Sequence, residues 1–464
     1  MGLGGYLTLL NASPYDWTLT NAHQYQMSAW SWPQTVSAGT STAVYVEWGS
    51  RGNRRDDAGE AYYTLKGTPD KFTVRASNKD FMDIFVTLDG IESQNNPRGS
   101  KIDIGFEHDG HKNFLLSGPA GDYVSSNPPV DWMQQNIGTL GNRKLRHICM
   151  PGSHDAGMST FGKGTAFVTR QNTLTQVLNI YDQLKAGSRY LDIRPVISGG
   201  QFFTGHYSEF QDTWLGVNGQ SIADIISQIN RFTNEYKELV ILDLSHAINT
   251  DQDYRNFNQG EWNRLFDQLK GLNNRLVNAV TDNTDLTQWP LHNFIGGNKA
   301  SVLIVADMAD GTNPGNYKKD GIFNRPNFPV FNSYADSNNA GDMASDQLRK
   351  LKDNRNVVSS GGKDGFFLLS WTLTQQEADV LNPVIWILDF AARAFSPLFY
   401  QAFNSISPTS FPNVLFIDLF GLDDNPYNRL DPEAPPRTYT VSRDVAAMAM
   451  AVNHIAGKNS FVTG

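Results

Sequence analysis

Apolar runs alternate with helical patterns from about Leu145 to the end of the chain. The helical patterns include residues 174–184, followed by Gly187 as a cap, and residues 222–236, 262–276 and 445–457. The eight apolar runs cover residues 146–150, 190–197, 202–206, 238–247, 300–308, 328–336, 365–371 and 413–421. Eight strand-like runs that alternate with helices predict an α/β fold, an irregular (β/α)8 TIM-like barrel.

The chain before this region has a different pattern. Residues 1 to about 125 form short aromatic and β-branched runs separated by turn sequences such as NASP, GTPD and NNPRGS. This spacing predicts an all-β sandwich, and the Gly/Ser/Pro-rich stretch 117–132 reads as a linker. We therefore expect an accessory or targeting β-sandwich domain over 1–125 and a barrel domain over 126–464. The aromatic stretch 15–32 is either core or an interfacial patch for lipid or sugar.

Polar side chains stand at the ends of the predicted barrel strands, where the chemistry of such barrels is found. The residues at or just past these ends are His154, Asp192, Arg194, His246, Asp307, Tyr334 and Asp418. Two further candidates, Asp155 and His206, follow His154 and the third apolar run. Two histidines can serve as acid and base near neutral pH. Arginine matches the geometry of a phosphate, and carboxylates can fix a histidine tautomer. This set favours phosphodiester chemistry.

Three motifs carry a resemblance to a known family. PGSHD at 151–155, YLDIR at 190–194 and GHYSE at 205–209 resemble the catalytic region of phosphatidylinositol-specific phospholipase C, the PI-PLC X domain. The resemblance covers about residues 132 to 430 and implies an irregular (β/α)8 barrel, in agreement with the strand pattern. The β-rich first part is not covered by it and would be an appended module.

The resemblance implies a role for each residue of the motifs. His154 would be the general base that deprotonates the inositol 2-hydroxyl, and His206 the general acid for the diacylglycerol oxygen. Asp155 would pair with His206, Arg194 would bind the phosphate, and Asp192 would position this group. The expected products are inositol 1,2-cyclic phosphate, or its glycan-linked equivalent, and diacylglycerol.

Strand order indicates one more catalytic residue, and the residues at two motif positions indicate whether the site uses calcium. Asp418, at the end of the last apolar run, is the candidate to orient His154. Calcium-dependent members of the family carry Asn after the first histidine, whereas this chain has Asp155, and its Arg194 could take the metal's electrostatic role. A cation beside this arginine would be repelled by about 1 kcal/mol or more. The chain thus resembles the metal-independent, bacterial-type members, and we expect neither calcium nor another cofactor.

The candidate substrate-binding residues are less distinctive. After the run ELVIL at 238–242 the family carries Lys or Glu, where this chain has Asp243, Ser245 and His246. Asp307 and either Tyr334 or Asp336 are further candidates to contact a sugar ring, with the tyrosine as a stacking platform.

The net charge and composition of the chain limit the kinds of partner that we expect it to bind. The net charge of −9 and the absence of a basic tract argue against nucleic acid. We expect a monomer that contacts an inositol phospholipid peripherally, at a membrane or micelle surface. No spanning segment and no secretory leader is expected, but a trimmed mature form would look the same, so extracellular and cytoplasmic locations both stay open. The single cysteine, Cys149, is expected to be buried.

Other interpretations remain open at this point. The apolar segment 381–403 is either a helix packed on the barrel or a lipid-touching lid with four exposed aromatics: Trp386, Phe390, Phe395 and Phe399. The site could act on another phospholipid head group or on a soluble glycerophosphodiester. A third alternative is a lipid- or glycan-binding protein with a vestigial barrel.

Overall fold

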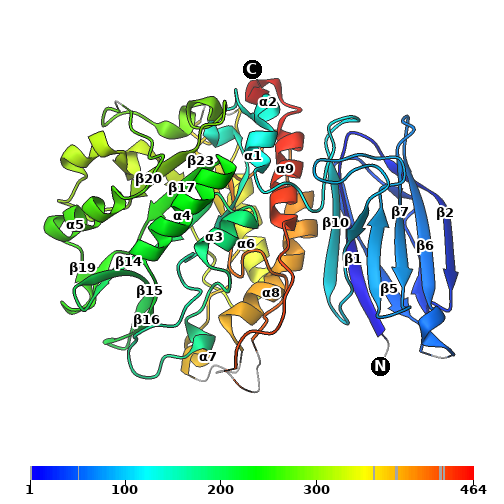
Figure 1. Cartoon of the computed structure of the whole chain (residues 1–464), viewed down its shortest axis with the longest axis horizontal. Coiled ribbons are helices and arrows are strands. Elements are labelled where there is room, and N and C mark those ends of the chain that lie inside the picture. Colours follow the sequence, from blue (N-terminus) through cyan, green and yellow to red (C-terminus); the bar gives the residue numbers. More distant parts are fainter. Residues whose placement is uncertain are drawn as a thin grey trace. The chain divides into compact units, whose positions relative to one another are not determined.

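The computed structural model describes residues 3–50, 52–278, 280–358, 361–381, 385–427, 431 and 434–463. The chain forms two compact units (Figure 1). The first comprises residues 1–129, 395–408 and 443–458, and the second comprises residues 130–394, 409–442 and 459–464. The expected boundary at residue 125 is close to the first break, but two later segments also join the first unit. As an assignment of accessory and catalytic domains, the division at residue 125 stays a prediction.

The first unit is built on two sheets that enclose one apolar core (Figure 1). One sheet has the order β11-β10-β1-β5-β3, and the other has the order β4-β2-β6-β7-β8-β9. The strands are β1 (Leu3–Ala12), β2 (Trp17–Tyr25), β3 (Ala29–Trp30), β4 (Thr35–Val36), β5 (Thr40–Trp48), β6 (Ala58–Leu65), β7 (Lys71–Ser77), β8 (Asp83–Thr87), β9 (Lys101–Asp103), β10 (His111–Ser117) and β11 (Val124–Ser125). Leu7, Leu9, Trp17 and Phe72 are among the core side chains that fill the space between the sheets.

The aromatic stretch 15–32 belongs mainly to this core. Trp17, Met27 and Trp32 are buried, and Trp30 stacks edge-on against Trp32. The rings of His23 and Tyr25, near the end of β2, are exposed. Packing therefore explains the three tryptophans of this stretch.

The outer face of the first sheet is also covered. Strand β1 is buried on both faces, because helix α9 (Asp444–Ala456) and the π-helical turn Leu398–Ala402 pack against it. Helix α9 also contacts β10 and β11. The apolar helix predicted over 445–457 is present, but the prediction of a barrel helix is wrong, because its partner is the N-terminal sheet.

The second unit is a mixed α/β structure around a curled parallel sheet of eight strands. The order is β21-β20-β17-β13-β12-β24-β23-β22, so the strands follow one another around the sheet in chain order. Within the described residues, no ladder joins β21 to β22. The strands are β12 (Met150–Ser153), β13 (Tyr190–Ile193), β17 (Leu239–Leu244), β20 (Ser301–Ala306), β21 (Ile322–Asn324), β22 (Val330–Phe331), β23 (Phe366–Ser370) and β24 (Val414–Ile417).

Helices surround this sheet, and α3 and α4 lie side by side (Figure 1). The helices are α1 (Trp132–Gln135), α2 (Ile137–Leu140), α3 (Ile180–Lys185), α4 (Ile222–Tyr236), α5 (Gln259–Leu269), α6 (Ala340–Asn354), α7 (Glu377–Leu381) and α10 (Ser460–Thr463), while α8 (Ile387–Pro397) runs on into the first unit. Asn258 and Glu261 cap the start of α5 by reciprocal hydrogen bonds.

One strand assignment needs correction. The run 202–206 is not a strand of the parallel sheet, because it lies in β15 (Gln201–Phe210), which pairs antiparallel with β14 (Pro195–Ser198) and β16 (Thr213–Ser221). These strands form a separate sheet with β18 (Ile248–Asn249) and β19 (Arg255–Asn256). The remaining place in the parallel sheet is taken by β21, whose three residues were too few to predict.

The first predicted helix is also shorter than expected. Helix α3 begins only at Ile180, after the N-cap Asn179. The preceding residues are in a loop, since Thr175 and Gln176 donate side-chain hydrogen bonds to the carbonyls of Asp155 and His154. These contacts tie the loop to the end of β12.

The hypothesis of an exposed aromatic lid over 381–403 is wrong. Residues 382–384 of this segment lie outside the described part, but the four aromatic side chains proposed as exposed are all buried. Trp386 stacks on Tyr427, and Phe395 packs against Phe399. The segment is therefore an interior element, and no helix in the described part of the chain is long and apolar enough to cross a membrane.

Candidate active site

A cavity of about 670 Å³ lies at the carboxyl ends of the parallel strands. Nine of the predicted residues line it: His154, Asp192, Arg194, His206, Asp243, His246, Asp307, Tyr334 and Asp418. Asp155 is fully buried behind this lining, and Asp336 is not part of it. The sequence therefore predicted a part of the cavity lining, the part that carries most of its ionisable side chains.

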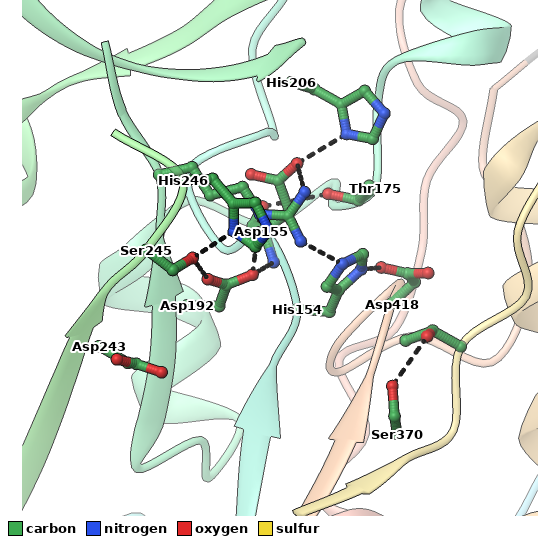
Figure 2. A network of polar contacts seen from close by, with 12 residues as sticks. His154, Asp155, Thr175, Asp192, His206, Asp243, Ser245, His246, Ser370 and Asp418 are labelled. Carbon is green, nitrogen blue, oxygen red and sulfur yellow. Dashed lines mark hydrogen bonds and ion pairs between the residues drawn. The ribbon is translucent and has the colours of Figure 1, made fainter. Parts of the chain in front are cut away.

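Strand register sets His154 beside Asp418. Ser153 of β12 pairs with Ile417 of β24. The next residues, His154 and Asp418, therefore also lie side by side. His154 Nδ1 lies 2.6 Å from Asp418 Oδ1 (Figure 2). This is the pairing expected from strand order.

The other ring nitrogen of His154 contacts Arg194, with Nη2 of the arginine 2.7 Å from Nε2. A guanidinium can only donate, so Nε2 is the unprotonated nitrogen and Nδ1–H donates to Asp418. Burial lowers the pKa of His154, but the charge of Asp418 outweighs it, and the net pKa is above the usual value. The hydrogen bonds thus fix a tautomer with Nε2 as the acceptor, and the raised pKa favours uptake of a second proton there.

Asp155 reaches the second histidine through an unusual backbone conformation. Its φ of 42° is in the left-handed region, and its N–H donates to Asp192 Oδ2 at 3.0 Å. Its Oδ2 lies 2.7 Å from His206 Nδ1 (Figure 2). The expected pairing is present, although His206 comes from the antiparallel ribbon and not from a barrel strand.

Arg194 lies between the two histidine–carboxylate pairs. Its Nε donates to Asp192 Oδ2 at 3.1 Å, and its Nη1 lies 3.6 Å from Asp155 Oδ2. Burial lowers the pKa of Arg194, but the charges of the two carboxylates raise it by more, so the net pKa is above the usual value. Burial likewise raises the pKa of Asp192, yet Arg194 and His154 hold it below its usual range. The Asp192 carboxylate and the Arg194 guanidinium are therefore both charged, and the guanidinium is the group that can bind an anion.

Three loop starts at the site adopt left-handed backbone conformations. They are Asp155, His246 with φ of 50° and Leu419 with φ of 53°. Each costs about 1–3 kcal/mol for a residue other than glycine, and such strain is concentrated at functional sites. The strain turns the chain sharply where His154, Ser245 and Asp418 enter the cavity.

A second ionic group is formed by Asp243, which the sequence indicated, and Arg325, which it did not. Arg325 donates to Asp243 at 2.7 Å and lies 3.5 Å from Asp307. Tyr190 also donates to Asp243 through its hydroxyl. Burial raises the pKa of Asp243 against the opposing charge of Arg325. Arg325 was missed because it follows β21, whose three residues gave no signal.

The last two predicted residues differ in outcome. Tyr334 lines the cavity and exposes 58% of its surface, so its ring is open to a ligand. Asp336 lies on the same loop, where its carbonyl accepts a hydrogen bond from Gln376 at 3.3 Å. It lies outside the cavity lining, and its role as a substrate contact stays a prediction. Cys149 is buried, as predicted.

Apart from His246, which contacts Ser245, the histidines and carboxylates that line the site are paired with one another or with arginine. Within the described residues, no group of three or more His, Cys, Asp or Glu side chains is arranged to hold a metal ion. The two carboxylates closest to the centre, Asp155 and Asp192, face the guanidinium of Arg194. The cation that lies nearest these two carboxylates is therefore a side chain of the chain itself.

Comparisons with known proteins agree with the motifs. No family model matches the chain. It is 27% identical over 143 residues to PI-PLC X domain-containing protein 3 of Bos taurus and 26% identical over 143 residues to the Homo sapiens protein of that name. The chain is similar to PI-PLC X-domain proteins. Each match covers 25% of this chain and 42% of the relative, so the chain spans less than half the length of these relatives. A mutant of phosphatidylinositol-specific phospholipase C from Staphylococcus aureus aligns with a TM-score of 0.45 at 15% identity, over 70% of this chain and 97% of that one.

Proposed function

We propose that this chain is a phosphodiesterase that cleaves phosphatidylinositol to inositol 1,2-cyclic phosphate and diacylglycerol. One observation carries the proposal: two histidine–carboxylate pairs, His154 with Asp418 and His206 with Asp155, stand on either side of Arg194. The similarity to PI-PLC X-domain proteins supports a phospholipase-like function.

The first half of the reaction uses His154. Its Nε2 takes the proton of the inositol 2-hydroxyl, and the hydroxyl oxygen forms a bond to phosphorus. Arg194 must exchange its contact with Nε2 for a non-bridging phosphate oxygen, which frees the base and neutralises charge on the phosphoryl group. Asp418 stabilises the imidazolium that forms.

The second half uses His206. The bond from phosphorus to the glycerol oxygen breaks, and His206 gives that oxygen a proton. Asp155 accepts from Nδ1 of this ring, so Nε2 is the nitrogen that carries the transferred proton. Atoms balance without water, and the cyclic diester leaves as the product.

We also propose that turnover requires no metal ion. What supports this is the guanidinium of Arg194, which already faces the carboxylates of Asp155 and Asp192. The cation that a phosphoryl group needs is thereby supplied by the chain itself.

The remaining features of the proposal concern architecture and partner. We regard the parallel sheet as a (β/α)8-type barrel open between β21 and β22, because its strands follow chain order around the sheet. The substrate would be reached by a monomer in peripheral contact with a lipid surface, and the first unit would be an accessory or targeting module.

Phosphorus NMR of the purified chain with phosphatidylinositol micelles in chelator tests the proposal. A cyclic phosphate signal from phosphatidylinositol, and none from phosphatidylcholine or sphingomyelin, is the expected result. Turnover of glycerophosphoinositol alone would identify a soluble diester as the substrate. No turnover of any diester would overturn the enzyme proposal and leave a binding function.

Variants distinguish turnover by this chain from turnover by a contaminating enzyme in the preparation. His154→Ala and His206→Ala should each lower kcat by about 10²–10⁴-fold, the range of general acid–base catalysis. His23→Ala, at an exposed position of β2, is the matched control and should retain full activity.

A further inference from the structure

His246 belongs to a hydrogen-bond chain that determines which of its nitrogens carries the proton. Its Nδ1 lies 2.9 Å from Ser245 Oγ, and Ser245 Oγ lies 2.6 Å from Asp192 Oδ1 (Figure 2). A hydroxyl has one hydrogen, and an ionised carboxylate can only accept. The Ser245 hydrogen therefore goes to Asp192, and the proton between His246 and Ser245 must come from Nδ1.

The second nitrogen, Nε2, is then a bare acceptor. His246 lines the cavity, and no hydrogen-bond partner of Nε2 is found among the residues that the structure describes. The left-handed backbone of His246, with φ of 50°, fixes the direction in which the ring leaves the strand. The backbone thus sets the direction of the ring, and the tautomer makes Nε2 an acceptor for a hydrogen bond from a ligand.

The ring is neutral in the resting site. Burial and the charge of Arg194 lower the pKa of His246, against the opposing effects of Asp192 and Asp155, and His154 adds to the lowering. A neutral imidazole has no charge to compensate an ammonium group, and a trimethylammonium group has no hydrogen to donate. The ligand group that suits Nε2 is a neutral O–H donor.

We propose that Nε2 of His246 accepts a hydrogen bond from a hydroxyl of the substrate head group and thereby selects polyol head groups over choline. The inference rests on the proposed function for its substrate but concerns a contact outside the bonds that form and break. Asp192 has two tasks, since Oδ2 holds Arg194 on the phosphate side while Oδ1 sets the tautomer of His246 through Ser245.

Two substitutions at one position test the contact. His246→Leu removes the acceptor, and we expect KM for phosphatidylinositol to rise about 3- to 10-fold, as for the loss of one neutral hydrogen bond, with little change in kcat. The inhibition constant of myo-inositol 1-phosphate should rise by the same factor, and that of phosphocholine should stay unchanged. His246→Gln keeps a side-chain acceptor and should recover part of the loss. A structural role would instead lower kcat for both substitutions and affect both inhibitors alike.

Nitrogen-15 NMR of the histidine rings provides a test that needs no turnover. In the wild-type chain we expect His246 to carry its proton on Nδ1, with an Nε2 signal that moves on addition of myo-inositol 1-phosphate and not of phosphocholine. An Nε2-protonated ring, or equal affinity of wild type and His246→Leu for myo-inositol 1-phosphate, including no binding by either, would overturn the inference. Absence of turnover with a responsive Nε2 would overturn the proposed reaction alone.

Discussion

Nη2 of Arg194 and Nε2 of His154 are 2.7 Å apart, so the cation assigned to the phosphate contacts the nitrogen assigned to the attacking hydroxyl. In the proposed mechanism the base is therefore covered until an anion draws the guanidinium away, so that phosphate binding activates the base. A ligand that lacks an anionic group would leave the base covered. The first two predictions concern the two groups that contact the ring of His154, Asp418 and Arg194.

Asp418→Asn is expected to move the acid limb of the pH profile. His154 acts unprotonated, so kcat/KM falls as the pH drops through its pKa. Burial lowers this pKa, but the Asp418 carboxylate raises it above the usual value. Without that charge the pKa falls, so the acid limb should move to lower pH, while the plateau falls by about 10²-fold or more. A limb that stays in place or moves to higher pH would show that another group controls it.

Arg194→Lys retains a charge but loses the planar fork that can donate two parallel hydrogen bonds. We expect kcat to fall by about 10²–10³-fold, the effect of removing one preorganised donor.

Wild-type turnover should be equal in chelator and in calcium. Collapse of wild-type activity in chelator with recovery in calcium would contradict the metal-independent mechanism.

Arg325→Met is expected to weaken substrate binding and to change the ionisation of Asp243. Burial already raises the pKa of Asp243, and the charge of Arg325 opposes this, so the pKa should rise further in the variant. Carbon-13 NMR of the carboxyl group measures the shift. KM for phosphatidylinositol should increase about 10-fold or more, as for loss of a charged hydrogen bond. Arg349→Met, in an exposed ion pair on α6, is the control and should change neither quantity.

Arg189→Met tests a structural ion pair at the other end of the sheet. Arg189 and Glu238 are both fully buried, 2.7 Å apart, and Glu238 also accepts from the backbone N–H of Gln134. Removing one partner of a buried pair costs about 3–5 kcal/mol, which urea unfolding would detect. Arg231→Met breaks the exposed pair of Arg231 with Glu235 and should leave the unfolding midpoint unchanged.

Local patterns predicted the parts of the site that follow clear apolar runs of the sequence. His154 and Asp418 could be paired in advance, because the first and last strands of a barrel are neighbours and each residue follows a clear apolar run. Arg325 could not be found, because β21 has three residues and its pairing with β20 is a tertiary contact. The origin of His206 in a hairpin was likewise hidden, since an apolar run does not reveal whether its partner is parallel or antiparallel.

The fold of the first unit was hidden for a similar reason. The two sheets follow from alternation and turns, but the cover of β1 (Leu3–Ala12) comes from the distant segments 395–408 and 443–458. An apolar helix pattern such as 445–457 predicts the helix but does not indicate the element against which the helix packs. The tertiary assignment therefore depended on contacts that no local window contains.

This discontinuity has a consequence for the growing polypeptide on the ribosome. The sheet that contains β1 emerges before the parallel sheet, yet one of its faces stays open until α9 has been made. A premature stop shortly before residue 443 would therefore leave β1 without this cover although every strand of the parallel sheet has been translated. The cover of the first sheet thus depends on residues made after all the strands of the second unit.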